Sequence, residues 1–239
     1  MAARLTRRDM KRDEVLETAT RVFHYLTEHT RGLLTVLLAV VALAVIAVGV
    51  FAYMQGRKDR ANTVFAEALN VFSADVVAEG AKPDDPVSPS FASAEARDAR
   101  AQALFQQVES EFGGTSVGRI AGVYLGKLAL QRGDAEGARS RWQAFLDSKP
   151  NHMLATEVRL NLLAMDRADG KGEAVLGRLR EMMADSSADL PPDVALEQMA
   201  VTLEELNRHE EARDIYQRIV DEYPTSAYSS KAQQKLRTL

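Results

Sequence analysis

The feature that most constrains the fold is the segment from Gly32 to Met54, which contains neither a charged residue nor a side-chain amide. As an α-helix it would extend roughly 33 Å at about 1.5 Å per residue, which matches the roughly 30 Å hydrocarbon core of a bilayer. Its Leu, Val, Ile and Phe side chains would contribute roughly 4 to 8 kcal/mol to insertion. The sequence therefore predicts one transmembrane helix over residues 32–56, with a long buried core helix as the alternative.

The apolar segment is longer than the roughly 7 to 15 apolar residues of a secretory signal, and no Ala-x-Ala cleavage site follows Met54. The chain also contains no cysteine, which excludes a lipid-modified cysteine, a disulfide and a thiolate metal site. We expect the helix to be retained as the anchor of a membrane protein.

The segment before this helix, residues 1–31, is a basic tail. Its basic residues are Arg4, Arg7, Arg8, Lys11, Arg12, Arg21 and Arg31. Long domains cross a membrane largely regardless of their charge, so the short tail decides the orientation. This predicts a cytoplasmic N-terminus and a periplasmic C-terminal domain in a bacterial inner membrane. Within the tail, residues 13–29 show apolar side chains at helical spacing, which indicates an amphipathic helix that lies on the membrane or docks on a protein.

After the apolar segment, Phe65, Leu69 and Phe72 recur at helical spacing, so the helix should continue as a juxtamembrane stalk over residues 57–78. The apolar side of the stalk could pack on the chain's own soluble domain or pair with a second copy. Three prolines then interrupt residues 79–93, which predicts a Pro-rich linker.

Residues 94–239 lack the alternation of strands and show helical stripes that repeat. An aromatic residue followed by a turn and Thr-Ser occurs at Phe112 and again at Tyr223. Between them, Ala138, Ala174 and Ala212 follow one another at spacings in the middle thirties. A period of this length is typical of stacked helical hairpins, each of which buries its apolar face against its neighbours.

The large, small and terminal-proline positions of two of these repeats resemble the tetratricopeptide repeat family. In the last repeat they are Leu196, Met199, Ala200, Leu203, Ala212, Tyr216, Ile219 and Pro224; near Ser116 they are Leu125, Gly126, Ala138, Trp142, Phe145 and Pro150. The middle repeat, from about His152, is degenerate: Ala174 is in place, the leucines around Leu160 are displaced by one residue, and Arg178 stands where an aromatic residue is expected. The helix from Ala94 to Phe112 resembles the second half of a still earlier unit.

The predicted fold is thus all-α, with an N-terminal single transmembrane helix followed by a tetratricopeptide-like α-solenoid of helical hairpins. The layout also resembles the single-span tetratricopeptide proteins that are ancillary to the bacterial SecYEG translocon. That resemblance implies a non-enzymatic adaptor or scaffold for protein–protein interactions, ancillary to protein translocation or to periplasmic chaperone networks. The alternative is a permanent structural accessory subunit of a large membrane complex.

Catalytic and metal-binding motifs have simpler explanations in this sequence. Residues 114–118 match the serine nucleophile pattern G-x-S-x-G, but that site needs a preceding strand, and we expect Ser116 to cap a helix instead. The acidic stretch 166–173 lacks the alternating ligands of a calcium loop and reads as a hairpin turn. We predict no catalytic residue, metal or cofactor, no small-molecule substrate, and, because the outer domain is acidic, no nucleic-acid partner.

The remaining candidate site is the concave face of the hairpin stack, where first helices can receive an extended peptide or a helix. The residues that the family's register places there are Tyr124, Lys127, Gln131, Arg159, Glu197, Gln198, Val201 and Glu205. A mixture of one aromatic ring and both signs of charge is suited to polypeptide partners. A merely solvated helix face is the alternative interpretation.

Overall fold

The computed structural model describes residues 30–77, 89–184 and 190–239. The basic tail with its amphipathic segment 13–29 and most of the Pro-rich linker lie outside these residues. The chain divides into two compact units, residues 1–59 and 60–239, and each is described by itself.

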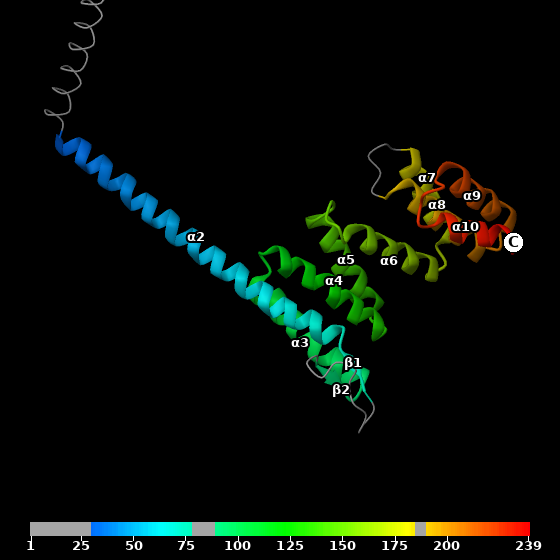
Figure 1. Cartoon of the computed structure of the whole chain (residues 1–239), viewed down its shortest axis with the longest axis horizontal. Helices are drawn as coiled ribbons and strands as arrows, with labels where there is room; N and C mark the ends of the chain where they lie inside the picture. The colour runs from blue at the N-terminus through cyan, green and yellow to red at the C-terminus, as the bar shows by residue number, and fades with distance from the viewer. Residues whose placement is uncertain (1–29, 78–88, 185–189) are drawn as a thin grey trace, which may run out of the picture. The chain divides into compact units, whose positions relative to one another are not determined.

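In the first unit, helix α2 (Thr30–Phe72) begins with the apolar segment (Figure 1). Large apolar side chains here face outward: Val45 is 67% exposed and Phe51 is 70% exposed. Helix residues Leu37–Phe72 include an 18-residue window with a mean hydropathy of 2.7, so this helix is long and apolar enough to cross a membrane. The predicted apolar helix is therefore confirmed as a helix, while its insertion in a membrane stays a prediction.

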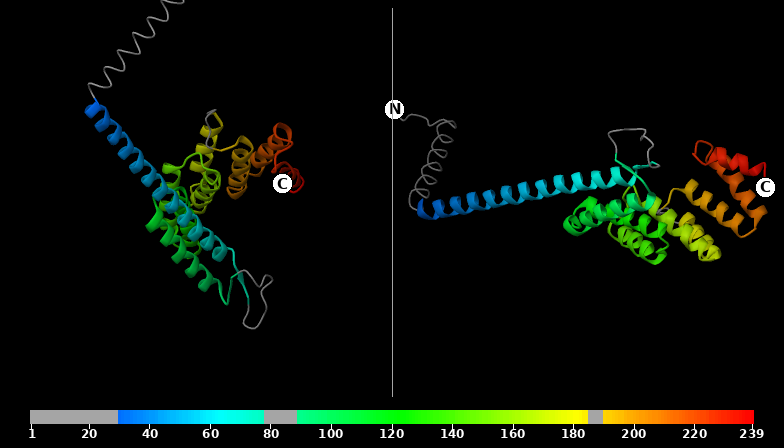
Figure 2. Two further views of the ribbon diagram at one scale, coloured as in Figure 1. Left: turned by 60° about the vertical axis from the view of Figure 1, so that its left-hand side comes forward. Right: turned by 90° about the horizontal axis from the view of Figure 1, so that it is seen from below.

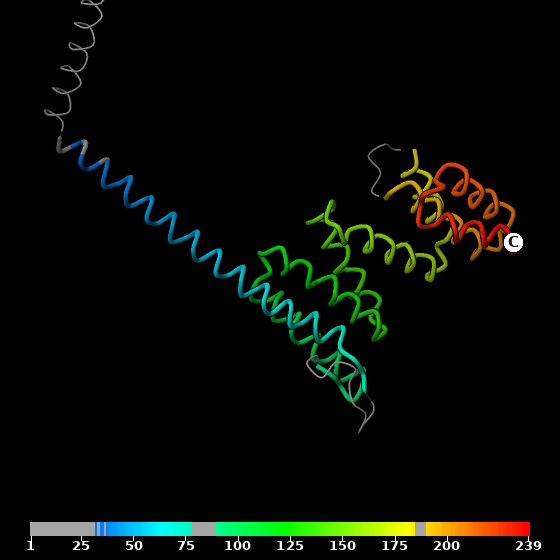
Figure 3. The backbone as a smooth tube through the Cα atoms, viewed as in Figure 1, coloured from blue at the N-terminus to red at the C-terminus, as the bar shows by residue number. Residues whose placement is uncertain are grey.

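The second unit begins within the same helix, because α2 passes from the apolar segment into the stalk without interruption (Figure 3). The short strands β1 (Asp75–Val76) and β2 (Ser90–Phe91) form a parallel pair. Within the described residues after β2, the helices are α3 (Ala94–Phe112), α4 (Ser116–Gln131), α5 (Ala135–Ser148), α6 (Ala155–Ala168), α7 (Gly172–Ala184), α8 (Pro192–Glu205), α9 (His209–Glu222) and α10 (Ser229–Leu236). Figure 2 shows α4 and α5, and likewise α8 and α9, side by side as hairpins.

The turns inside three successive hairpins show the true period of the repeat. Gly133, Gly170 and Asn207 have φ angles of 82°, 75° and 58°, and they are 37 residues apart. The left-handed region is open to glycine without strain and is tolerated best, among other residues, by Asn. The hairpins therefore share one register from α4 to α9, and the middle repeat is not displaced.

This register corrects the assignment of the middle repeat. The residues equivalent to Ala138 and Trp142 are Val175 and Leu179, both with no exposed surface, whereas Ala174 and Arg178 are exposed. One residue turns a helix by about 100°, so a shift of one position moves a side chain out of the core. Ala174 indicated a register that is wrong by one residue, because the structural equivalent of Ala138 is Val175.

The same register extends backward to α3. Ala101 and Phe105, both fully buried, precede Ala138 and Trp142 by one repeat, which confirms that α3 is the second helix of an earlier hairpin. The first helix of that hairpin is the stalk, since Ala68 and Val71 of α2 share a core with α3 and α4. The stalk therefore packs on the chain's own repeats, one of the two arrangements expected.

Hairpins close tightly where a small residue faces a large one. Gly126 of α4 lies against Trp142 of α5, and its equivalent Ala200 of α8 shares a core with Tyr216 of α9. In the middle hairpin the small position is Leu163, opposite Leu179. Two leucines at this place keep the helices apart, and α6 and α7 approach each other along a shorter stretch than α4 and α5 do.

Candidate functional site: the face of the first helices

The first helices of the three regular hairpins are α4, α6 and α8, and the surface they share is here called the first-helix face. The predicted residues on α4 have predicted counterparts on α8, two repeats later. Tyr124 corresponds to Gln198, Lys127 to Val201, and Gln131 to Glu205. Gln131 and Glu205 are exposed and Lys127 and Val201 are half-buried, so the face reaches solvent at both helices.

Side-chain pairs join consecutive first helices across this face. Lys127 Nζ of α4 lies 2.5 Å from Glu157 Oε1 of α6. Arg167 of α6 donates to Gln198 Oε1 at 2.9 Å, and its Nε lies 3.1 Å from Glu205 Oε2, both on α8. The predicted residues therefore stabilise the stacking of the hairpins as well as forming a surface.

Glu197 lies at the next step of the stack, between α8 and the closing helix α10. The residue is 3% exposed, its carboxylate lies 2.5 Å from Lys231 Nζ of α10, and it accepts a hydrogen bond from Gln198 Nε2 at 2.7 Å. These two donors compensate for its burial. Its carboxylate is engaged within the chain.

A second acidic group holds α10 in the same way. Glu204 of α8 accepts hydrogen bonds from Lys235 Nζ, at 2.5 Å, and from the hydroxyl of Tyr216. Burial alone would raise the pKa of Glu204, but the hydrogen bonds from Lys235 and Tyr216 outweigh it and hold this pKa below its usual value. The pKa of Tyr216 is raised, mainly by burial and to a smaller extent by the hydrogen bond that its hydroxyl donates to Glu204.

Tyr124 lies at the end of the face nearest the stalk and is partly covered by it. Its ring stacks on Phe105 with centroids 4.9 Å apart, and it meets Phe65 and Phe72 of α2 edge to face at 5.9 and 5.5 Å. Lys127 Nζ lies 5.0 Å from the centre of the same ring. The aromatic residue predicted for partner binding thus also joins the stalk to the repeats.

The structure does not bring Arg159 to the first-helix face. Arg159 is the equivalent of Gly122 and Leu196, and it lines a cavity between α5, α6 and α7. The residues of α6 equivalent to the predicted ones are instead Asn161, Ala164 and Ala168, which the sequence reasoning missed. Counting one repeat period of 37 residues from Lys127 gives Ala164, and a second period gives Val201, so the correct period identifies these positions.

The G-x-S-x-G segment has the structure of a helix start. Helix α3 precedes it, so the strand that a nucleophile elbow needs is missing at this place. The expected cap at Ser116 was wrong by one residue: Thr115 is the N-cap of α4, and its Oγ1 accepts from Gly118 N at 3.1 Å. Ser116 is the first residue of the helix and is exposed.

The acidic stretch 166–173 contains the turn between α6 and α7, as expected. Gly170 supplies the positive φ, and the carboxylates of Asp166 and Asp169 contact Arg139. Across residues 30–77, 89–184 and 190–239, no group of three His, Asp or Glu is placed to hold a metal ion.

The stacked hairpins and their shared register define a helical repeat protein whose first helices present a mixed polar surface. The family model of the tetratricopeptide repeat-like domain matches residues 28–239, and the chain belongs to this family. Repeats of this family serve protein–protein interaction and are typically non-catalytic. None of the curated proteins compared with the chain matches it.

Proposed function

We propose that this protein is a membrane-anchored scaffold whose repeats bind protein partners through the first-helix face. The observation that carries the proposal is the continuity of α2: one helix supplies both the apolar segment and the first helix of the first hairpin. The apolar segment therefore leads directly into the repeats that carry the proposed binding surface.

The finer proposal is an inner-membrane protein of a bacterium with the repeats in the periplasm, ancillary to protein translocation or to periplasmic chaperones. It is supported by the basic tail before the apolar segment and by the layout of anchor, stalk and repeats. Protease added to spheroplasts of the producing bacterium should digest the repeats and spare the tail. Protection of the repeats would contradict the orientation.

Site-specific photocrosslinking in cells tests the binding surface. A photoreactive amino acid at Gln131 or at Val201 should give discrete protein adducts, because these positions reach solvent at the two ends of the first-helix face. The same amino acid at Arg213, exposed on the second helix α9, serves as the control. Equal adducts from all three positions, or none from the face, would contradict the proposal.

A specific observation favours a second candidate, a permanent structural subunit. The charged groups Lys127 and Glu205 are engaged with Glu157 and Arg167, which suits a surface built for stacking more than for capturing charged clients. Purification in detergent separates the two candidates. A stoichiometric complex that survives high salt supports the subunit, whereas substoichiometric, salt-sensitive partners support the scaffold.

A further inference from the structure

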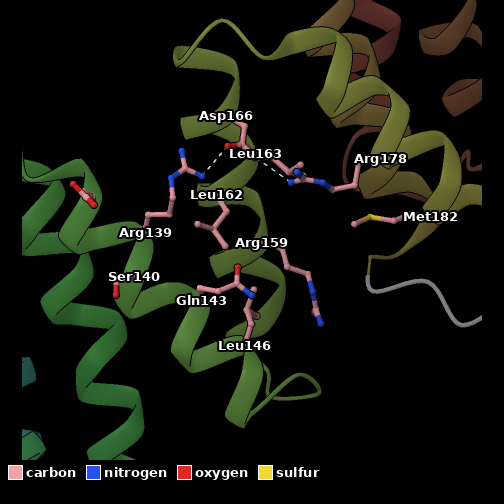
Figure 4. Close-up of a pocket in the computed structure, with 11 residues that line it drawn as sticks. Arg139, Ser140, Gln143, Leu146, Arg159, Leu162, Leu163, Asp166, Arg178 and Met182 are labelled. Carbon is pink, nitrogen blue, oxygen red and sulfur yellow. Dashed lines mark hydrogen bonds and ion pairs between the residues drawn. The ribbon is translucent and has the colours of Figure 1, made fainter.

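The middle hairpin contains a cavity of about 690 Å³, lined by α5, α6 and α7 (Figure 4). Its volume lies within the roughly 300–1,000 Å³ typical of ligand sites. It lies apart from the first-helix face, because its lining includes no residue of α4 or α8 and, on α6, none of the face positions Asn161, Ala164 and Ala168.

The repeat register explains why this space is open. In α8, Leu196, Ala200 and Leu203 are buried against α9 with at most 2% exposure. The equivalent residues of α6 are Arg159, Leu163 and Asp166, and all of them line the cavity. The surface of α6 that a second helix would cover thus carries two charged side chains and an oversized leucine. Leu163 and Asp166 are buried, at 2% and 6% exposure, whereas Arg159 is half-buried, so the cavity opens to solvent beside Arg159.

The charges around the cavity are arranged around one carboxylate. The Asp166 side chain is 9% exposed, and its two oxygens lie 2.7 Å from Arg139 Nη1 of α5 and 3.0 Å from Arg178 Nη1 of α7. Figure 4 shows Asp166 between these two arginines. With Arg159, three arginines face the cavity against Asp166 and Glu136, in a chain whose formal net charge is −4.

The other side chains around the cavity are largely apolar. Leu146 of α5, Leu162 of α6 and Met182 of α7 line it together with Leu163. Leu162 and Leu163 are already buried, whereas Leu146 and Met182 are half-buried. A bulky apolar side chain entering this space would remove the exposed surface of Leu146 and Met182 from water, and carboxylates beside it would meet the guanidinium groups.

We infer that the cavity between α5, α6 and α7 is a second binding site, which takes a peptide segment with a bulky apolar side chain flanked by carboxylates. The apolar side chain occupies the part of the cavity lined by Leu146 of α5 and Met182 of α7. The carboxylates pair with Arg159 and Arg178 at the rim. This site goes beyond the proposed function, which rests on the first-helix face.

Fluorescence anisotropy with the full chain in detergent tests the site. The probe is a labelled synthetic peptide with leucine and phenylalanine at helical spacing between glutamates. A second peptide has lysine in place of every glutamate, and a third has serine in place of the apolar residues. We expect saturable binding of the first peptide and binding of the other two weaker by at least about tenfold.

Blocking the cavity requires a variant with a matched control. Gln143 of α5 is exposed, lines the cavity and donates to Asp147 at 3.1 Å; its equivalent two repeats later, Gln217, donates to Asp221 at 3.0 Å. Gln143→Trp should weaken binding of the acidic peptide by at least about tenfold, and Gln217→Trp should leave it unchanged. Circular dichroism verifies that both variants fold.

A second pair of variants tests the charge without filling the space. Arg178→Gln should weaken binding of the acidic peptide several-fold. Arg180→Gln, on an exposed position of the same helix, should leave this binding unchanged. Absence of saturable binding to the unmodified chain, equal binding of the lysine peptide, or undiminished binding to both Gln143→Trp and Arg178→Gln would overturn the inference. Adducts from Val201 should persist in Gln143→Trp, which separates a failure here from a failure of the first-helix face.

Discussion

The indole of Trp142 lies directly against Gly126, and a Cβ added to that glycine would approach Cδ1 of the ring to 2.8 Å. The indole N–H donates to the carbonyl oxygen of Val123 at 3.0 Å, so the ring is held from two sides. A glycine at this position lets α4 and α5 approach closely enough to bury the tryptophan to 1% exposure.

Gly126→Ala should therefore destabilise the repeats although alanine favours helices. The added methyl group must displace a ring that has no space to move, which costs about 1–3 kcal/mol in a well-packed core. Urea unfolding measures the change, with Gly177→Ala as the control, because a Cβ at 177 meets nothing within 4 Å. Stabilisation by Gly126→Ala would show that the ring moves freely.

Thr115→Ala should lower the unfolding free energy by about 1 kcal/mol, because it removes the hydroxyl that accepts from Gly118 N at the start of α4. Ser116→Ala, one residue later and exposed, is the matched control and should change stability by only a few tenths of a kcal/mol. A larger loss of stability in Ser116→Ala than in Thr115→Ala would instead identify Ser116 as the N-cap.

The stalk should unfold together with the repeats. Phe65→Ala removes edge-to-face contacts with Phe105 and Tyr124, and we expect it to destabilise the whole second unit by about 2–3 kcal/mol. Asn62→Ala, on the exposed side of the same helix, is the control. Hydrogen exchange should show loss of protection in α3 and α4 with Phe65→Ala. A loss of protection confined to α2 would contradict the shared core.

The contribution of Glu204 to stability should disappear in acid. Although burial opposes it, the hydrogen bonds from Lys235 and Tyr216 hold the folded-state pKa of Glu204 below its ordinary value of 4.5. A lowered pKa stabilises the folded state above that ordinary value, and the stabilisation is lost as the pH falls through the folded-state pKa.

Glu204→Gln should thus lower the unfolding free energy at neutral pH, and the difference from the unmodified chain should shrink progressively below the ordinary pKa of 4.5. Urea unfolding at a series of pH values measures this, with Glu210→Gln on the exposed start of α9 as the control. A difference that stays constant into acid would show that packing, and not charge, accounts for the effect.

Much of the fold follows from local patterns in the chain. The apolar segment, the stalk spacing of Phe65, Leu69 and Phe72, and the repeated small and large residues each report on one helix or one hairpin, where side-chain periodicity is decisive. The register of the middle repeat did not follow, because its core contains Val175 and Leu179 instead of the alanine and aromatic residue that the other repeats show. The positive φ at Gly170 identifies the register of the middle repeat, and this backbone angle is a property of the turn in three dimensions.

The candidate site was predicted in part for the same reason. Lys127 and Gln131 of α4 lie at positions equivalent to Val201 and Glu205 of α8, because both helices have a clear register. Their use by a partner stays a prediction. Arg159 was assigned with a register that is off by one residue, so it lies at the cavity instead. The partners of the charged residues, such as Glu157 for Lys127, come from neighbouring repeats and are not visible in any single repeat.

The amino-acid sequence by itself determined that this chain forms one long apolar helix followed by stacked helical hairpins, because helix formation and hairpin closure depend on residues close together along the chain. Only the tertiary structure decided that the stalk is the first helix of the stack, that α10 is held by the carboxylates of Glu197 and Glu204, and that α5, α6 and α7 line a charged cavity. These features depend on which side chains meet across repeats, and such contacts join residues that lie about a repeat or more apart in the chain.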